Sequence, residues 1–139
     1  MQRGSFVDCW FPFAEHPALP APVRHIVYVQ SRIRLNSGAV RSIVMLTTTS
    51  PKMIEAIPPG LSITISKDGS MQMGMRSAFT IDIHRLAALP PNEDWFPDIE
   101  SPNFVIAQAD DHLQRAITKR YDWMLEQYPR PAILLGPGI

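Results

Sequence analysis

The chain has 139 residues, of which 45% are hydrophobic and 19% are charged, which is the composition of an ordinary globular protein. Its length suits one domain, and no apolar run approaches the roughly 20 residues of a membrane-spanning helix. The single cysteine, Cys9, cannot form an internal disulfide, and the N-terminal sequence lacks a signal-peptide pattern. We therefore expect one cytoplasmic domain spanning residues 1–139, with no membrane contact.

The formal net charge is zero, but the charges are unevenly distributed along the chain. Residues 1–90 contain nine Lys or Arg and five Asp or Glu, a balance of +4, whereas residues 91–139 contain four and eight, a balance of −4. This asymmetry is typical of a protein that binds a polyanion on one part of its surface, although an ordinary solvated surface explains it equally well.

The first 90 residues favour short β-strands separated by prolines and glycines. Each predicted strand is rich in β-branched or aromatic residues, or alternates between apolar and polar side chains. The loop at 16–22 contains three prolines and is expected to be exposed, and residues 36–38 predict a hairpin turn. The predicted strands are residues 6–11, 25–29, 32–35, 42–49, 61–65 and 77–83.

Because no helix is predicted between these strands, the expected fold is mainly β with a C-terminal helix. Residues 1–90 would form a small antiparallel barrel or a strongly bent sheet. An acidic, proline-rich connection at 91–109 leads to a helix at 110–128, which Asp110 or Asp111 can cap. Residues 129–139 form a tail that either lies on the body or contacts a partner. The apolar face of the helix is Leu113, Ala116, Ile117, Tyr121, Met124, Leu125 and Tyr128.

Three blocks of the sequence resemble the PemK/MazF toxins. A short strand runs into Phe11-Pro12-Phe13, and a loop then ends in Arg24 before an apolar strand, as at the start of that family. The strand at 43–50 ends in polar residues, and the segment at 74–86 is similar to a family segment that begins with Gly and ends in an acid and an arginine. The three blocks occur in the family's order and cover roughly residues 3–90.

This resemblance implies an SH3-like antiparallel β-barrel and an endoribonuclease of a type II toxin–antitoxin system, an mRNA interferase that inhibits growth. It also implies a homodimer, with single-stranded RNA in the dimer groove, and a cognate antitoxin that occupies the same groove. No metal or other cofactor is required, because the ribose 2′-hydroxyl attacks the adjacent phosphate and leaves 2′,3′-cyclic phosphate and 5′-hydroxyl ends.

Four residues are candidates for catalysis. The reaction needs a base for the 2′-hydroxyl and positive charge on the phosphorane. Asp82, in the 77–83 strand on a polar face opposite the apolar one, is the predicted base. Arg24 is predicted to stabilise the phosphoryl oxygens with its paired donors. Thr48 or Thr49 could hold a phosphate oxygen or the 2′-hydroxyl.

Five further residues are candidates for RNA binding. Trp10 and Phe13 are aromatic residues on which bases could stack. Some family members carry an arginine two residues before the acid, where this chain has Thr80, and the nearby basic residues could supply that charge. The sequence also has His25 after Arg24 where the family has proline, and Ile83 where it has glutamine. The basic candidates are Arg76, His84 and Arg85.

Several of these residues have a plain structural interpretation. Arg24 alone is more often a surface ion pair than a catalyst, and Asp82 is often solvated or paired with a neighbour such as Arg85. Cys9 is expected to be a buried thiol, and the histidines show no metal-ligand spacing. The methionines at 71–75 are expected to pack within a strand, with a flexible lip for a partner as the alternative.

Two other functions remain open on the sequence alone. The first is a non-catalytic SH3-like binding module for protein or nucleic acid. The second is a phage-type structural or interaction protein, in which the proline-rich loops and the 129–139 tail mediate assembly.

Overall fold

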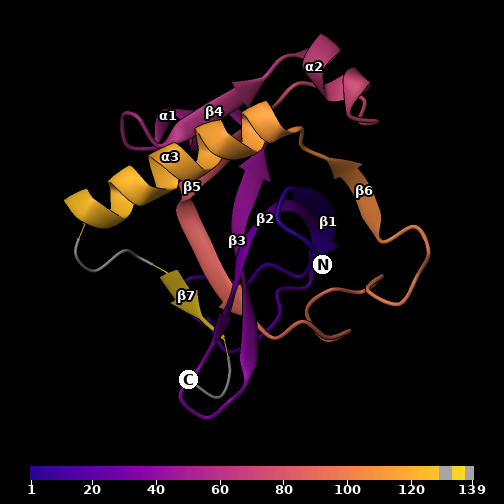
Figure 1. The fold of residues 1–139 in the computed structure, drawn as a ribbon, viewed down its shortest axis with the longest axis vertical. Coiled ribbons are helices and arrows are strands. Elements are labelled where there is room, and N and C mark those ends of the chain that lie inside the picture. The colour runs from indigo at the N-terminus through magenta and orange to yellow at the C-terminus, as the bar shows by residue number, and fades with distance from the viewer. Residues whose placement is uncertain (129–132, 137–139) are drawn as a thin grey trace.

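The structure of the protein, a computed structural model, describes residues 1–128 and 133–136. In that part of the chain, seven strands form one sheet and three helices accompany it (Figure 1). The mainly β fold with a C-terminal helix is therefore as predicted. The elements are β1 (Ser5–Cys9), β2 (His25–Arg34), β3 (Val40–Thr48), α1 (Pro51–Glu55), β4 (Ser62–Ile65), α2 (Lys67–Gln72), β5 (Phe79–Leu89), β6 (Val105–Gln108), α3 (Asp111–Gln127) and β7 (Ile133–Leu135).

The strands follow the order β4-β5-β3-β2-β1-β6, with β7 beside β5. All of these pairs are antiparallel except β5 with β7, which is parallel. The β2–β3 hairpin turns where the sequence predicted, since the Leu35 N–H donates to the Ala39 carbonyl. Among the described residues no helix is long and apolar enough to cross a membrane.

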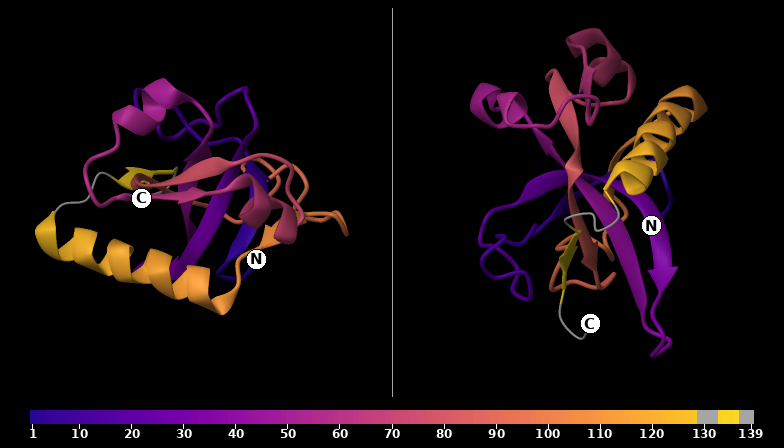
Figure 2. Two further views of the ribbon diagram at one scale, coloured as in Figure 1. Left: turned by 90° about the horizontal axis from the view of Figure 1, so that it is seen from above. Right: turned by 90° about the vertical axis from the view of Figure 1, so that its left-hand side faces the viewer.

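Both faces of the sheet are covered (Figures 1 and 2). On one face, α3 packs through Ile117 and Met124 against a core that includes Phe6, Tyr28 and Ile83. A second core lies on the other face. It contains Val7, Val27, Val29 and Leu89 together with the aromatic side chains of Phe11, Trp95, Phe96 and Phe104. The acidic connection at 91–109 therefore contributes to the core through its aromatic residues.

Helix α3 begins and packs largely as its sequence pattern indicates. The Asp110 carboxylate caps it by accepting a hydrogen bond from the Leu113 N–H at 2.8 Å. The inner face holds the buried Ile117 and Met124, with Tyr121 partly buried beside them. Leu125 and Tyr128 were expected in this face but are 38% and 39% exposed.

Gly4 joins the first strand to two other parts of the chain. Its N–H donates to the Val29 carbonyl, and its own carbonyl accepts from Ala109 just before α3. Its φ is +92°, a conformation that favours glycine. The N-terminal end of β1 is thereby tied to β2 and to the β6–α3 junction.

Four short elements were not predicted. Ser50 caps α1 and Ser66 caps α2 through their hydroxyl groups, but five- and six-residue helices are too short to show helical periodicity. Met71 lies in α2, so the expectation that the methionines at 71–75 form a strand is wrong. Strand β6 lies within the 91–109 connection. In the 129–139 tail, β7 lies on β5, and residues 129–132 and 137–139 are outside the described part.

Candidate functional site

Two adjoining hollows lie at the end of the sheet where β2 begins and β3 ends. The larger, which we call the Arg24 hollow, has a volume of about 660 Å³. Its apolar lining includes Ile26, Met53 and Phe79, and Arg24 and Arg76 contribute positive charge. None of the described residues that line it is acidic. The full lining is Arg24, His25, Ile26, Leu46, Thr47, Thr48, Thr49, Ser50, Met53, Gly74, Met75, Arg76, Ser77, Phe79 and Ile106.

The second, which we call the Phe13 hollow, has a volume of about 570 Å³. It shares His25, Leu46 and Met53 with the Arg24 hollow, so the two hollows meet at these side chains. The lining is Phe11, Pro12, Phe13, Ala14, Glu15, His25, Leu46, Met53, His84, Arg85, Leu86 and Leu134.

The structure brings together most of the residues selected from the sequence. Seven of the nine candidates line one of the two hollows, although they come from five separate segments of the chain. Trp10 and Asp82 line neither hollow. The Arg24 hollow contains Arg24, Thr48, Thr49 and Arg76, and the Phe13 hollow contains Phe13, His84 and Arg85.

Arg24 is an ion-paired side chain in this structure. Its Nη1 lies 3.3 Å from an Asp98 carboxylate oxygen and 3.8 Å from one of Asp8, and its guanidinium lies 5.2 Å from the centre of the Trp10 ring. Burial raises the pKa of Asp8, Arg24 opposes that rise, and Asp98 adds to it. Because Arg24 and Asp98 are both substantially exposed, the pair is weak and an anionic ligand can compete for the guanidinium.

Asp82 is buried, contrary to its predicted place on a solvated polar face. The sheet is covered on both sides, and Asp82 is only 3% exposed. Its Oδ1 accepts hydrogen bonds from the backbone N–H groups of His84 and Arg85, at 3.0 and 3.1 Å, and its Oδ2 lies 3.7 Å from the Arg85 Nε. The sequence allowed this ion pair with Arg85 as the structural alternative to a catalytic role for Asp82.

The Asp82 carboxylate stabilises an irregularity in β5. Met45 of β3 pairs with Leu86, but the next residue of β3, Leu46, pairs with Asp82, so three residues of β5 bulge out of the ladder. This bulge carries His84 and Arg85, both of which line the Phe13 hollow. Burial raises the pKa of Asp82, and the two N–H groups and Arg85 oppose that rise. Asp82 thus positions the basic residues of the second hollow.

The threonines at the end of β3 differ in their freedom to bind a ligand. Thr48 is largely buried, and its hydroxyl accepts a hydrogen bond from the Ser50 N–H at 3.1 Å. Thr49 is exposed and lines the Arg24 hollow. Thr80, which stands where some PemK/MazF proteins carry arginine, is buried with its hydroxyl 3.0 Å from that of Thr64.

His25 is a residue that the sequence analysis noted only as a replacement for proline. It begins β2 and lines both hollows at their junction. Partial burial lowers its pKa from the usual 6.5, so at pH 7 the imidazole is mainly neutral and able to accept a proton. Its position directly after Arg24, at the start of an apolar run, was the signal that could have identified it.

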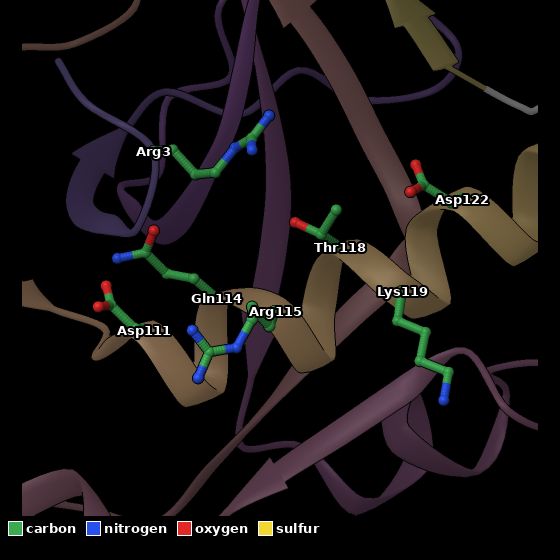
Figure 3. A pocket seen from close by; sticks show the side chains of 7 residues that line it. All are labelled: Arg3, Asp111, Gln114, Arg115, Thr118, Lys119 and Asp122. Atoms are coloured by element: carbon green, nitrogen blue, oxygen red, sulfur yellow. The ribbon is translucent and has the colours of Figure 1, made fainter.

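A third pocket, of about 420 Å³, lies along the polar face of α3 (Figure 3). It contains three cationic side chains, but the charged ends of Arg3, Arg115 and Lys119 point in different directions. Asp111 and Asp122 add negative charge to the same surface. This pocket contains none of the residues selected from the sequence, and its charges do not converge on one point.

Two further observations bear on the chemistry. Within residues 1–128 and 133–136, no three His, Cys, Asp or Glu side chains are grouped closely enough to hold a metal ion. Cys9 is fully buried, as predicted, and burial together with Asp8 raises the pKa of its thiol far above the usual range.

Comparison with known proteins gives no match: no protein-family model and no curated protein matches this chain.

Proposed function

We propose that the two adjoining hollows bind single-stranded RNA and cleave it without a metal ion, as in the PemK/MazF toxins. One observation carries the proposal. Seven of the nine residues that the family resemblance selects line two hollows that share three side chains.

The Arg24 hollow suits a nucleotide in both shape and charge. Its apolar lining can accept the face of a base, and Arg24 and Arg76 can bind the phosphates that flank it. No acidic residue of the described part lines this hollow, and the Asp8 and Asp98 carboxylates approach it only through their ion pairs with Arg24. Phe13, which is 51% exposed, offers a stacking surface for a neighbouring base in the second hollow.

In the proposed reaction, the ribose 2′-oxygen forms a bond to phosphorus and loses its proton to a base. The bond from phosphorus to the 5′-oxygen breaks, and that oxygen takes up a proton. Arg24 stabilises the charge on the phosphoryl oxygens after leaving Asp98, and Thr49 hydrogen-bonds an oxygen of the substrate. Asp82 was the predicted base, and His25, neutral and at the junction of the hollows, is the second candidate.

The proposal includes the cellular context that the family resemblance implies. The protein would act in the cytoplasm as a homodimeric growth-inhibiting toxin, and a cognate antitoxin would occupy the RNA groove. We also propose that the bent sheet is an SH3-like barrel. Register shifts in the β1–β6, β2–β3 and β3–β5 ladders support this, because such irregularities bend strands.

A second candidate is a binding module without catalysis. It is favoured by the carboxylates beside Arg24 and by the burial of Asp82, the predicted base, which lines neither hollow. Such a module would use the same hollows to hold RNA or an acidic peptide and would leave RNA intact.

Cleavage of a mixed-sequence RNA in the presence of EDTA distinguishes the two candidates. We expect discrete cuts with 2′,3′-cyclic phosphate ends from the wild type and none from Arg24→Ala. The variants His25→Ala and Asp82→Asn identify the base, because the loss of the base abolishes cleavage while RNA binding persists. Arg115→Ala, on the outer face of α3, is the control. Intact RNA from folded wild-type protein would remove the enzymatic proposal.

A further inference from the structure

The far end of the β2–β3 hairpin carries a second concentration of positive charge. No Asp or Glu occurs between Glu15 and Glu55, while this stretch contains Arg24, Arg32, Arg34, Arg41 and Lys52. Three of these arginines lie in residues 31–41, the far half of the hairpin, which we call the basic arm. Figures 1 and 2 show the arm extending from the body at the end opposite α1 and α2.

Two of the three arginines in the arm present their charge to solvent. Arg32 and Arg34 are exposed, and neither forms an ion pair with a carboxylate of the described residues. They are two residues apart on one strand, so their side chains lie on the same face. The Arg34 guanidinium donates to the Gly38 carbonyl at 2.8 Å, which fixes it at the tip of the hairpin.

The polar composition of the arm suits a phosphate backbone. Asn36 and Ser37 at the turn are exposed and can donate hydrogen bonds to phosphate oxygens. Ile33, 39% exposed, lies on the opposite face of the strand from the two arginines and takes no part in this surface. On its β1 side, β2 has no ladder partner in the described structure after Tyr28, so this edge of the arm is open.

We infer that the basic arm is a second binding site for single-stranded RNA, which holds the backbone of a segment next to the one in the hollows. This inference rests on the proposed RNA substrate. Arg32 lies eight residues beyond Arg24, which directly precedes β2, a separation of about 26 Å at about 3.3 Å per residue. At about 3.4 Å per stacked nucleotide, about eight nucleotides span that distance.

RNAs of two lengths therefore distinguish binding at the arm from binding at the hollows. An RNA of about four nucleotides fills the hollows alone, whereas one of about sixteen reaches both sites. Affinities are measured for both lengths at several salt concentrations with the wild type, Arg32→Ala/Arg34→Ala, and Arg32→Lys/Arg34→Lys. The control is Arg115→Ala/Lys119→Ala, which removes two exposed cations from α3. Thermal melts verify that each variant is folded.

The alanine pair is expected to bind the long RNA about tenfold more weakly, with a salt dependence of log K reduced by about 1.4, or about 0.7 for each lost phosphate contact. Its affinity for the short RNA stays the same, and the lysine pair and the control keep near wild-type affinity for both. Unchanged binding of long RNA by the alanine pair, or equal weakening by the control, would overturn the inference that the arm binds RNA, while the proposed function stands. Long-RNA binding that depends on the arm, without any cleavage, would support RNA binding by the arm and refute the proposed cleavage activity. Wild-type protein that binds neither RNA would overturn both.

Discussion

Removal of the Asp82 carboxylate tests the conclusion that this residue maintains the β5 bulge. In Asp82→Ala, the N–H groups of His84 and Arg85 lose their acceptor in a site that is almost inaccessible to water. Hydrogen bonds to a charged group contribute about 1.5–3 kcal/mol each, and the release of a buried charge offsets part of that loss. We expect a net destabilisation of about 2–4 kcal/mol, or a Tm lower by roughly 8–15 °C.

Asp82→Asn separates hydrogen bonding from charge. The amide oxygen can still accept both N–H groups, and the lost contact to Arg85 is weak because the Arg85 side chain is 53% exposed. This variant should lie within about 1 kcal/mol of the wild type. Urea and thermal unfolding monitored by circular dichroism measure both variants, with the exposed Asp122→Ala as the control. Equal stability of the alanine and asparagine variants would refute the role of Asp82 as the acceptor.

The same pair gives a test of pH dependence. Because burial raises the pKa of Asp82 above its ordinary value of 3.8, the folded state holds this proton more tightly than the unfolded state. The contribution of Asp82 to stability is therefore largest below pH 3.8 and falls as the pH rises through the raised folded pKa. Asp82→Asn should lack this component, and a wild-type profile identical to that of the variant would contradict the assignment.

Three other perturbations have definite expected outcomes. Asp98→Asn releases Arg24 from its shorter ion pair, so the affinity for single-stranded RNA should rise about two- to fivefold in a fluorescence titration, and a fall would contradict competition at Arg24. The Cys9 thiol should react with Ellman's reagent only as fast as the protein unfolds, and rapid reaction of the native protein would contradict its burial. Gly4→Ala should destabilise by about 2–3 kcal/mol in urea unfolding, because alanine is strained at a φ of +92° and its Cβ would displace the amide ends of Gln108 and Gln114 from the carbonyls of Arg3 and Ala109. Gly38→Ala, with a similar φ but open space, should cost only about 1 kcal/mol, and equal losses would refute the steric argument.

The sequence predicted β1 to β5 and the last helix because their side-chain patterns are long enough to show a period. The apolar run at 25–29 lies in β2, and Asp110 caps α3 as its type and place suggest. The β5 bulge could not be predicted, because alternation continues to Ile83 and the ladder with β3 is a long-range contact. The sequence placed Asp82 on a solvated face because it did not show that cores cover both faces of the sheet.

The site was predictable in its residues more than in its arrangement. Arg24 and Arg76 are 52 positions apart, and only the folded sheet brings both to one hollow. The sequence did not indicate that Asp8 and Asp98 pair with Arg24, because the two acids come from segments distant in the chain. The position of His25 directly after Arg24 was a sequence signal for the site, but its proposed role as a base depends on its place between two hollows, which only the fold shows.

The most direct test of the account is to map where RNA contacts the protein. Single-stranded RNA containing 4-thiouridine is photo-crosslinked to the wild type, and the attached peptides are identified by mass spectrometry. Crosslinks are expected in peptides that contain Phe13, His25 or Met75, which line the two hollows, and they should decrease in Arg24→Ala. Crosslinks confined to the α3 pocket around Arg115, or none with folded protein, would contradict the proposal that the two hollows bind RNA.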